Sequence, residues 1–173
     1  MIFDVLGFGR PPGKFGRGRL THAEVSFGPS LSLIADALGL PLDSLEASGE
    51  LAIATRTIEI AAGMVEAGTV AGQRLTVAGM RNGQPLLRFR ATWYCTPELD
   101  VEWDLLPSGW RISLEGDAPL QVEMRLSFPL ERMAEMTPGY TAHRAVNAVP
   151  IVCDAAPGIR TTVDLPQIIA QLG

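Results

Sequence analysis

The sequence has few of the residues that bind metals or act as nucleophiles. Its 173 residues include two cysteines, Cys95 and Cys153, and two histidines, His22 and His143. The cysteines stand far apart in the chain and form no Cys-x-x-Cys pair, so the ligands of a zinc site are missing. We therefore expect no metal site, and we expect both cysteines to be small buried side chains.

Positive charge and long apolar runs are also scarce. Fourteen Lys and Arg residues face nineteen Asp and Glu residues, which leaves a formal net charge of -5. A protein that binds nucleic acid through its phosphates needs the opposite sign. No apolar stretch reaches the roughly 20 residues that cross a bilayer, and the N-terminus lacks the pattern of a signal peptide. We expect no nucleic-acid partner, no membrane and a cytoplasmic location.

What the chain does have is enough apolar material for one core. Hydrophobic residues make up 47% of the sequence and charged residues 19%. This composition excludes a disordered chain, and the length fits one domain over residues 1–173. Within it, residues 7–19 are rich in glycine, proline and cations, which predicts a loop without regular structure.

The hydrophobic spacing indicates an α+β fold. Residues 31–38 repeat at helical spacing between Ser30 as N-cap and Gly39 as stop. Alternation predicts a strand over residues 49–60, a loop over 63–72, and a hairpin over 73–94 that turns at Asn82-Gly83. Two further strands are predicted at residues 110–115 and 120–127, as part of the same sheet. Together they predict an open-faced, mostly antiparallel sheet of about five to six strands with helices packed on one face.

The remaining segments are read as helix, strand and helix. A short helical stretch follows Pro129, an interruption is expected at residues 137–141, and a second helix follows from Ala142. Proline inside that helix removes a backbone hydrogen bond, so we expect a kink or break near Ala148. Residues 159–163 predict a short strand, and Pro166 begins a final short helix.

The glycine-rich loop is a poor match to a nucleotide site. Gly7, Gly9 and Gly13 give the spacing G-x-G-x-x-x-G, with two prolines inside, which departs from the dinucleotide pattern. Proline lacks the N–H that would bind phosphate. Arg10, Lys14 or Arg17 can still contact a ligand held elsewhere, and Arg10 is our weak candidate for cofactor contact.

Polar side chains gather on the segment around His143. Tyr140, His143, Arg144 and Asn147 recur at spacings of three and four on a helix that is otherwise apolar. Leaving such groups buried without hydrogen bonds costs about 1–3 kcal/mol each. They either bond to one another and to nearby carbonyls, or they face a wet cleft. A third reading gives His143 general acid or base chemistry with a carboxylate nearby.

A second polar set lies on the predicted hairpin. Arg88, Arg90 and Thr92 alternate with Leu87, Phe89 and Ala91, so one sheet face is cationic and the other apolar. The cationic face is either solvated or lines a cleft near Trp93 and Tyr94. No Gly-x-Ser-x-Gly elbow occurs, which leaves acyl transfer without support.

Four strings, in order along nearly the whole chain, resemble a known family. They are Phe8-Gly-Arg-Pro-Pro, Phe27-Gly-Pro-Ser-Leu with residues 35–43, residues 85–95, and residues 139–150. These strings are similar to the C-terminal domain of 2,4-diaminopentanoate dehydrogenases and native amine dehydrogenases, which are often labelled dihydrodipicolinate reductase-like. In that family an N-terminal Rossmann domain binds NADP or NAD, and this nucleotide-binding domain is absent here.

The resemblance implies a role in reductive amination of a carbonyl compound or the reverse. It implies a small-molecule amine or ketone substrate, a homodimer, and a C-terminal domain that supplies the substrate cleft and the dimer contact. His143 and Asn147 match a segment that borders the family's cleft, with Tyr140, Trp93 and Tyr94 as further substrate-binding candidates. No catalytic residue can be named.

On this interpretation the chain is the substrate-binding and dimerisation part of an oxidoreductase, truncated, inactive and without cofactor by itself. Whether the chain is an enzyme stays open. The alternative is a stand-alone small-molecule-binding protein or a homodimeric assembly module without catalysis.

Overall fold

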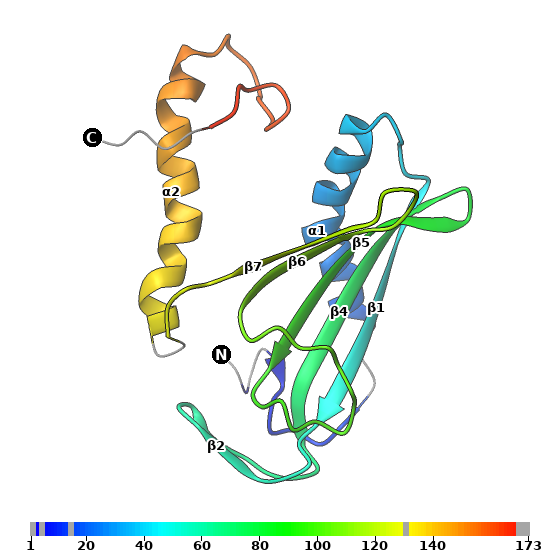
Figure 1. The fold of residues 1–173 in the computed structure, drawn as a ribbon, viewed down its shortest axis with the longest axis vertical. Coiled ribbons are helices and arrows are strands. Elements are labelled where there is room, and N and C mark those ends of the chain that lie inside the picture. Colours follow the sequence, from blue (N-terminus) through cyan, green and yellow to red (C-terminus); the bar gives the residue numbers. More distant parts are fainter. Residues whose placement is uncertain (1–2, 4–5, 14–15, 130–131, 169–173) are drawn as a thin grey trace. The chain divides into compact units, whose positions relative to one another are not determined.

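A computed structural model describes residues 3, 6–13, 16–129 and 132–168. The chain divides into two compact units, Met1–Leu105 and Leu106–Gly173. The prediction of one domain over residues 1–173 stays a prediction. With two helices and antiparallel strands, the fold is α+β as predicted (Figure 1).

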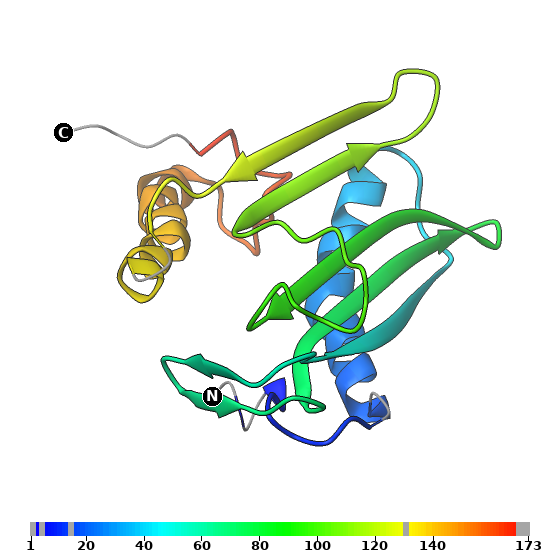
Figure 2. The same cartoon turned by 60° about the horizontal axis from the view of Figure 1, so that its bottom comes forward.

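The first unit is built on a three-stranded antiparallel sheet. Its strands are β1 (Ser44–Ile53), β4 (Val70–Arg81) and β5 (Gln84–Tyr94), in the order β1-β4-β5 (Figure 2). The hairpin between β4 and β5 is confirmed, since Asn82 and Gly83 have φ angles of 52° and 72°, as a type I′ turn requires. The sheet has fewer strands than the five to six predicted.

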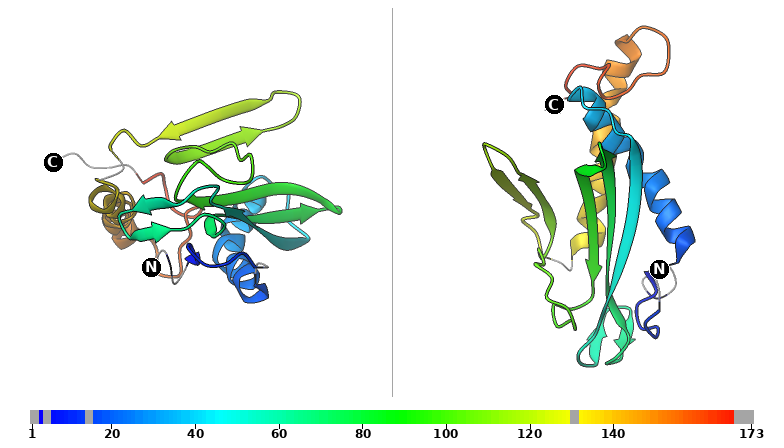
Figure 3. Two further views of the ribbon diagram at one scale, coloured as in Figure 1. Left: turned by 90° about the horizontal axis from the view of Figure 1, so that it is seen from below. Right: turned by 90° about the vertical axis from the view of Figure 1, so that its right-hand side faces the viewer.

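Helix α1 (Arg17–Ala37) covers one face of this sheet (Figure 3, right). It ends, as predicted, just before Gly39, which has a φ of 70°. Its start was predicted wrongly in two respects: the helix begins 13 residues ahead of Ser30, and the loop predicted over residues 7–19 ends at Gly16 among the described residues.

Packing explains the longer helix. Leu20, Ala23, Phe27 and Leu31 form the helix face that meets Val77 and its neighbours in the main core. Phe27 stacks on Phe89 of β5, with ring centroids 4.4 Å apart. Burial of this face outweighs the unfavourable helix propensity of glycine and of Pro29 inside the helix. The core therefore sits between α1 and one face of the sheet.

A smaller core lies beside the end of the sheet. It buries Ala54, Val65 and Ala71, and the hairpin of β2 (Ile58–Ile60) and β3 (Gly63–Val65) packs there. The strand predicted over residues 49–60 is thus two strands, starting earlier at Ser44 and interrupted after Ile53. The loop predicted over residues 63–72 was wrong, because it contains β3 and the start of β4.

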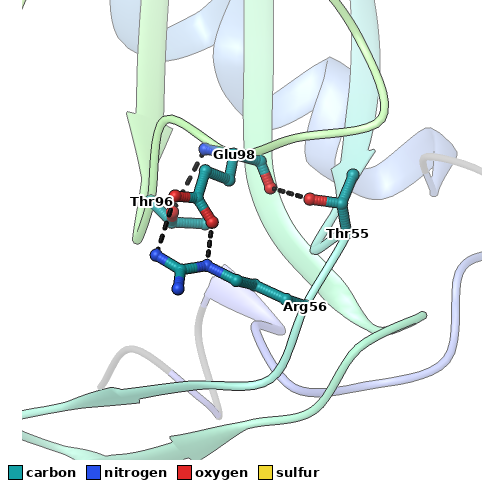
Figure 4. Close-up of polar contacts among 4 residues, drawn as sticks. All are labelled: Thr55, Arg56, Thr96 and Glu98. Carbon is teal, nitrogen blue, oxygen red and sulfur yellow. Dashed lines mark hydrogen bonds and ion pairs between the residues drawn. The ribbon is translucent and has the colours of Figure 1, made fainter.

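Polar contacts attach the segment after β5 to the segment after β1 (Figure 4). Arg56 forms a bidentate ion pair with Glu98, in which Nη2 lies 2.7 Å from Oε1 and Nε donates to Oε2. Thr55 Oγ1 donates to the Glu98 carbonyl at 3.0 Å, and the Glu98 N–H donates to Oγ1 of the buried Thr96 at 3.1 Å. Both oxygens of the Glu98 carboxylate therefore accept hydrogen bonds from Arg56.

The second unit contains a hairpin of its own. Strands β6 (Gly109–Leu114) and β7 (Leu120–Arg125) form close to where they were predicted, and they pair with each other. They form a separate two-stranded sheet, so the prediction that they extend the main sheet was wrong. Pro97 and Pro107, which cannot donate to a ladder, lie in the segment between β5 and β6.

Helix α2 (Met133–Asp154) is one helix where two were predicted. The helix continues through both Pro138 and Pro150. The predicted interruption at residues 137–141 and the predicted break near Ala148 were therefore wrong. The carbonyls that these prolines leave unbonded belong to Ala134 and Val146, both exposed, where water can bond to them.

The tail after α2 also differs from the prediction. Residues 159–163 form no strand, and Ile159 is almost fully exposed. Of the helix predicted from Pro166, residues 166–168 are irregular and the rest lies outside the described residues. No described helix is long and apolar enough to cross a membrane.

Candidate functional site

One side of α1 carries a row of polar side chains next to its apolar face. Arg19, His22 and Ser26 are three and four residues apart, so they lie along one side of the helix, next to the face that packs on the sheet. Ser26 Oγ lies 3.4 Å from His22 Nε2. The row faces a groove between α1 and the strands β4 and β5.

The lining of this groove includes a buried amide. Gln73, at the start of β4, is 5% exposed, and its Oε1 accepts a hydrogen bond of 3.3 Å from Arg19 Nη1. An amide at this depth needs such a partner, because an unsatisfied polar group in the interior costs about 1–3 kcal/mol. The bond thereby fixes a cation at the edge of the groove.

Trp93 forms the opposite wall. It pairs with Gln73 across the sheet, and its indole is 38% exposed. The groove has a volume of about 360 Å³, within the range of small-molecule sites. Its floor is apolar and its rim polar; the described residues that line it are Gly18, Arg19, His22, Ala23, Ser26, Phe27, Gln73, Leu75 and Trp93. Such a lining suits a small molecule with an apolar body and one hydrogen-bonding group.

The neighbouring candidate Tyr94 points the other way, because successive side chains of a strand alternate between its faces. Burial raises the pKa of its phenol. Next to it, Cys95 packs against the smaller core, and burial raises the pKa of its thiol to about 11. Cys95 is half-buried and Cys153 exposed, so the prediction that both are buried was wrong for Cys153.

The other three substrate candidates lie together on α2. Tyr140 and His143 are exposed and Asn147 is half-buried. The Tyr140 ring lies 6.2 Å from that of Phe128, and the His143 imidazole lies against Gly139. No hydrogen bond joins these three side chains to one another in the described part of α2. Their role in a substrate cleft stays a prediction.

Arg10 lies on a loop that is held by its backbone. The N–H of Gly9 donates to the carbonyl of Val70 at 2.8 Å, and the N–H of Val70 donates to the carbonyl of Arg10 at 2.9 Å. The side chain of Arg10 is exposed, and its contact with a cofactor stays a prediction. Among the described residues, no three His, Cys, Asp or Glu side chains gather as metal ligands would.

Sequence reasoning found one wall of the groove and missed the other. Trp93 was a candidate, whereas Arg19, His22 and Gln73 were not. Arg19 had been placed in the loop, so its spacing to His22 and Ser26 had no meaning. The available signal was the apolar repeat of Leu20, Ala23 and Phe27, which places the polar residues on an adjacent helix face.

Comparison with known proteins identifies the family. The family model of the 2,4-diaminopentanoate dehydrogenase C-terminal domain matches residues 7–173. This chain belongs to that family. The resemblance seen in the sequence is thus confirmed, and the chain is the C-terminal type of domain of a dehydrogenase.

Two amine dehydrogenases are similar to this member of the family. One from Streptomyces virginiae is 26% identical over 154 residues, which cover 85% of this chain and 43% of the relative. The structure of an amine dehydrogenase from Mycobacterium smegmatis matches with a TM-score of 0.60 at 20% identity, over 95% of this chain and 46% of that one. The second likeness shows the fold. The chain spans less than half the length of either relative.

Proposed function

We propose that this chain is the substrate-binding and dimer-forming part of an NAD(P)-dependent, amine dehydrogenase-like oxidoreductase. The reaction is reductive amination of a ketone or aldehyde, or its reverse. A nicotinamide nucleotide bound outside the described residues would supply or accept the hydride at the carbon that bears nitrogen. By itself the chain holds the organic substrate and transfers no hydride.

The groove between α1 and β5 carries this proposal. An alkyl ketone or amine has an apolar body and one small polar group, and the groove has an apolar floor with polar groups along one rim. Leu75 and Phe27 belong to this floor, which would contact the alkyl part of the substrate. Arg19, fixed by Gln73, and the His22 imidazole lie where the polar group would be recognised.

Family membership supports the reaction class. The family model covers residues 7–173, and a relative with 26% identity is an amine dehydrogenase. The stand-alone binding module remains the second candidate, and the same groove would serve it. With a nucleotide-binding partner present, the oxidoreductase part would convert its substrate, whereas the stand-alone module would only bind it.

A calorimetric titration with a short ketone, pentan-2-one, and with the amine pentan-2-amine tests the groove. Trp93→Ala is expected to weaken binding about tenfold, because losing one aromatic wall forfeits about 1–1.5 kcal/mol. Arg19→Gln is expected to weaken it as well while leaving the groove's shape in place. The matched control is Trp110→Ala, which removes an exposed indole of β6.

Equal affinities for the wild type, Trp93→Ala and Arg19→Gln would place any substrate site elsewhere in the chain. Circular dichroism of each variant distinguishes weakened binding from a folding defect.

A further inference from the structure

The free edge of β1 shows which of its backbone groups point away from the sheet. In the strand order β1-β4-β5, β1 has a neighbouring strand on one side only. The Ala47 N–H donates to Glu24 Oε1 of α1 at 3.1 Å, and the Ile53 N–H donates to Asp100 Oδ1 at 2.7 Å. Neither acceptor belongs to β4. Both N–H groups therefore lie on the outer side of β1.

Between these two bonds the edge of β1 is open. Along an antiparallel pair, the backbone groups of successive residues point alternately toward the partner strand and away from it. Because Ala47 and Ile53 point away from β4, the N–H and C=O groups of Gly49 and Leu51 do so as well. Within the described part of the chain, neither of these two N–H groups donates a hydrogen bond. An edge with such open groups can pair with a further strand.

A groove lies along this open stretch of β1. Its volume is about 590 Å³, in the range of ligand sites. One wall is β1 from Ala47 to Ile53, which measures about 20 Å at the usual rise of a strand. The other walls are Leu20 of α1 and the loop residues Pro12 and Gly13. We call this hollow the β1 groove.

The polar groups of the β1 groove belong mainly to the backbone. Among the described residues that line it, Ser48 alone has a polar side chain. The outward N–H and C=O groups recur at every second residue, about 7 Å apart. An extended polypeptide carries backbone groups at the same interval, so it can bond to the whole row. A small molecule with one polar group would satisfy a single position.

We propose that the β1 groove binds an extended segment of another polypeptide, which pairs with β1 as an added strand. Leu45 and Ala47 pack toward α1, so Gly49 and Leu51 lie on the same face of the sheet. Residues of the added strand opposite Gly49 and Leu51 share that face, where apolar side chains fit against Leu20. The residue between them points to the other face and can be polar. The partner is thus a short segment with apolar residues at alternate positions.

Two carboxylates limit the length of this segment. Glu24 accepts the hydrogen bond of the Ala47 N–H, and Asp100 accepts that of the Ile53 N–H. Asp100 also donates its own N–H to the Ile53 carbonyl at 3.0 Å, so this end of β1 is already paired. The added strand therefore bonds to β1 between these positions, over about three to five of its own residues.

A second copy of the chain fits this edge poorly. If two β1 strands paired antiparallel with Gly49 of one copy opposite Leu51 of the other, Ala47 of one copy would lie opposite Ile53 of the other. The carboxylates of Glu24 and Asp100, which cap those two residues, would then meet at the same place and repel each other. The occupant is therefore a different polypeptide.

An NMR titration of the isotope-labelled 173-residue chain with the peptide acetyl-Lys-Val-Thr-Val-Lys-amide tests the proposal. The two valines supply the apolar alternate residues, and the amide signals of Gly49 and Leu51 are expected to shift. Arg90 is the internal control. The N–H of Cys95, which follows β5, donates to the Ala71 carbonyl of β4, so by alternation the Arg90 N–H lies on the outer edge of β5. Its signal is expected to stay in place, and an equal shift there would overturn the proposal.

A matched peptide with N-methyl groups on both valines separates strand pairing from apolar binding. Methylation keeps the valine side chains and removes the two N–H groups that would donate to β1. This peptide is expected to bind at least tenfold more weakly than the first. Equal affinities of the two peptides would contradict the added strand, and so would an unmethylated peptide that shifts neither signal up to about 5 mM.

Dilution of the chain without peptide separates a different polypeptide from a second copy. The amide signals of Gly49 and Leu51 are expected to be independent of the chain's concentration. Signals that move on dilution would show that a second copy occupies the edge, against the proposal. The β1 groove and the groove beside Trp93 share none of their described lining residues, so none of these outcomes bears on ketone binding.

Discussion

The two cysteines differ in how open they are to solvent and reagents. Cys95 follows β5 and packs against the smaller core, where burial raises the pKa of its thiol to about 11. Cys153 lies exposed near the end of α2. The thiolate is the reactive form, so burial protects Cys95 both from contact with reagents and from ionisation.

Alkylation with iodoacetamide at pH 8, followed by peptide mass spectrometry, checks this difference. A pKa of about 11 against the ordinary 9.0 leaves about a hundredfold less thiolate at Cys95. Exposed Cys153 is therefore expected to be modified much faster than Cys95, and the Cys153→Ser variant is expected to incorporate almost no label. Rapid labelling of Cys95 in that variant would show that its site is open.

The same pKa shift has a consequence for stability at alkaline pH. Between pH 9 and 11 the folded state keeps the proton of Cys95 that the unfolded state releases. The stability linked to this group is complete below pH 9 and is lost as pH rises through 11.

Single residues were predictable from the sequence where strand alternation places them. The assignment of Leu87 and Phe89 to the core side, and of Arg88 and Arg90 to the other, follows from a period of two and is confirmed. The burial of Gln73 was not predictable, because it depends on where α1 lies. Only the structure brings Arg19 to its amide.

At the scale of elements, the β4–β5 hairpin is the feature that depends most clearly on local sequence. Both turn residues, Asn82 and Gly83, have positive φ angles, and Asp43 Oδ2 accepts a hydrogen bond of 2.6 Å from the Asn82 N–H. A Cβ added at Gly83 would have no atom within 4 Å. A substitution there therefore tests backbone conformation alone.

Gly83→Ala is expected to lower the free energy of unfolding by about 1–2 kcal/mol, the cost of the left-handed conformation for an L-residue. Urea denaturation followed by circular dichroism measures this change. The neighbouring Gln84→Ala, at an exposed position with an ordinary φ, serves as the control and is expected to change stability by under about 0.5 kcal/mol. Equal effects of the two substitutions would argue against the type I′ turn.

Helices were harder to predict than strands because their ends depend on packing. The first half of α1 has no side-chain cap and contains glycine, so local signals favour a loop, yet Leu20 and Ala23 pack on the sheet. Helix α2 continues past Pro138 and Pro150, and the residues whose carbonyls these prolines leave unbonded, Ala134 and Val146, are exposed. The expectation that proline ends a helix therefore predicted two interruptions in α2 that the structure does not show.

At the scale of the whole molecule, the chain matches one part of longer proteins. It belongs to the family of the 2,4-diaminopentanoate dehydrogenase C-terminal domain, its fold is similar to part of an amine dehydrogenase structure, and it spans less than half the length of the two relatives. Hydrophobic spacing predicted the α+β class but not the division into two units, since β6 and β7 alternate like strands of the main sheet. Pairing partners are set by tertiary contacts, which alternation alone does not specify.

We propose that the chain binds an organic substrate in the groove beside Trp93 while the nucleotide binds elsewhere. The most direct measurement follows the indole N–H signals of Trp93, Trp103 and Trp110 by NMR, first with pentan-2-one and then with NADPH. The ketone is expected to shift the Trp93 signal and leave that of Trp110 in place, and NADPH is expected to shift none. A ketone that moves no indole signal, or NADPH that moves that of Trp93 by itself, would contradict this proposal.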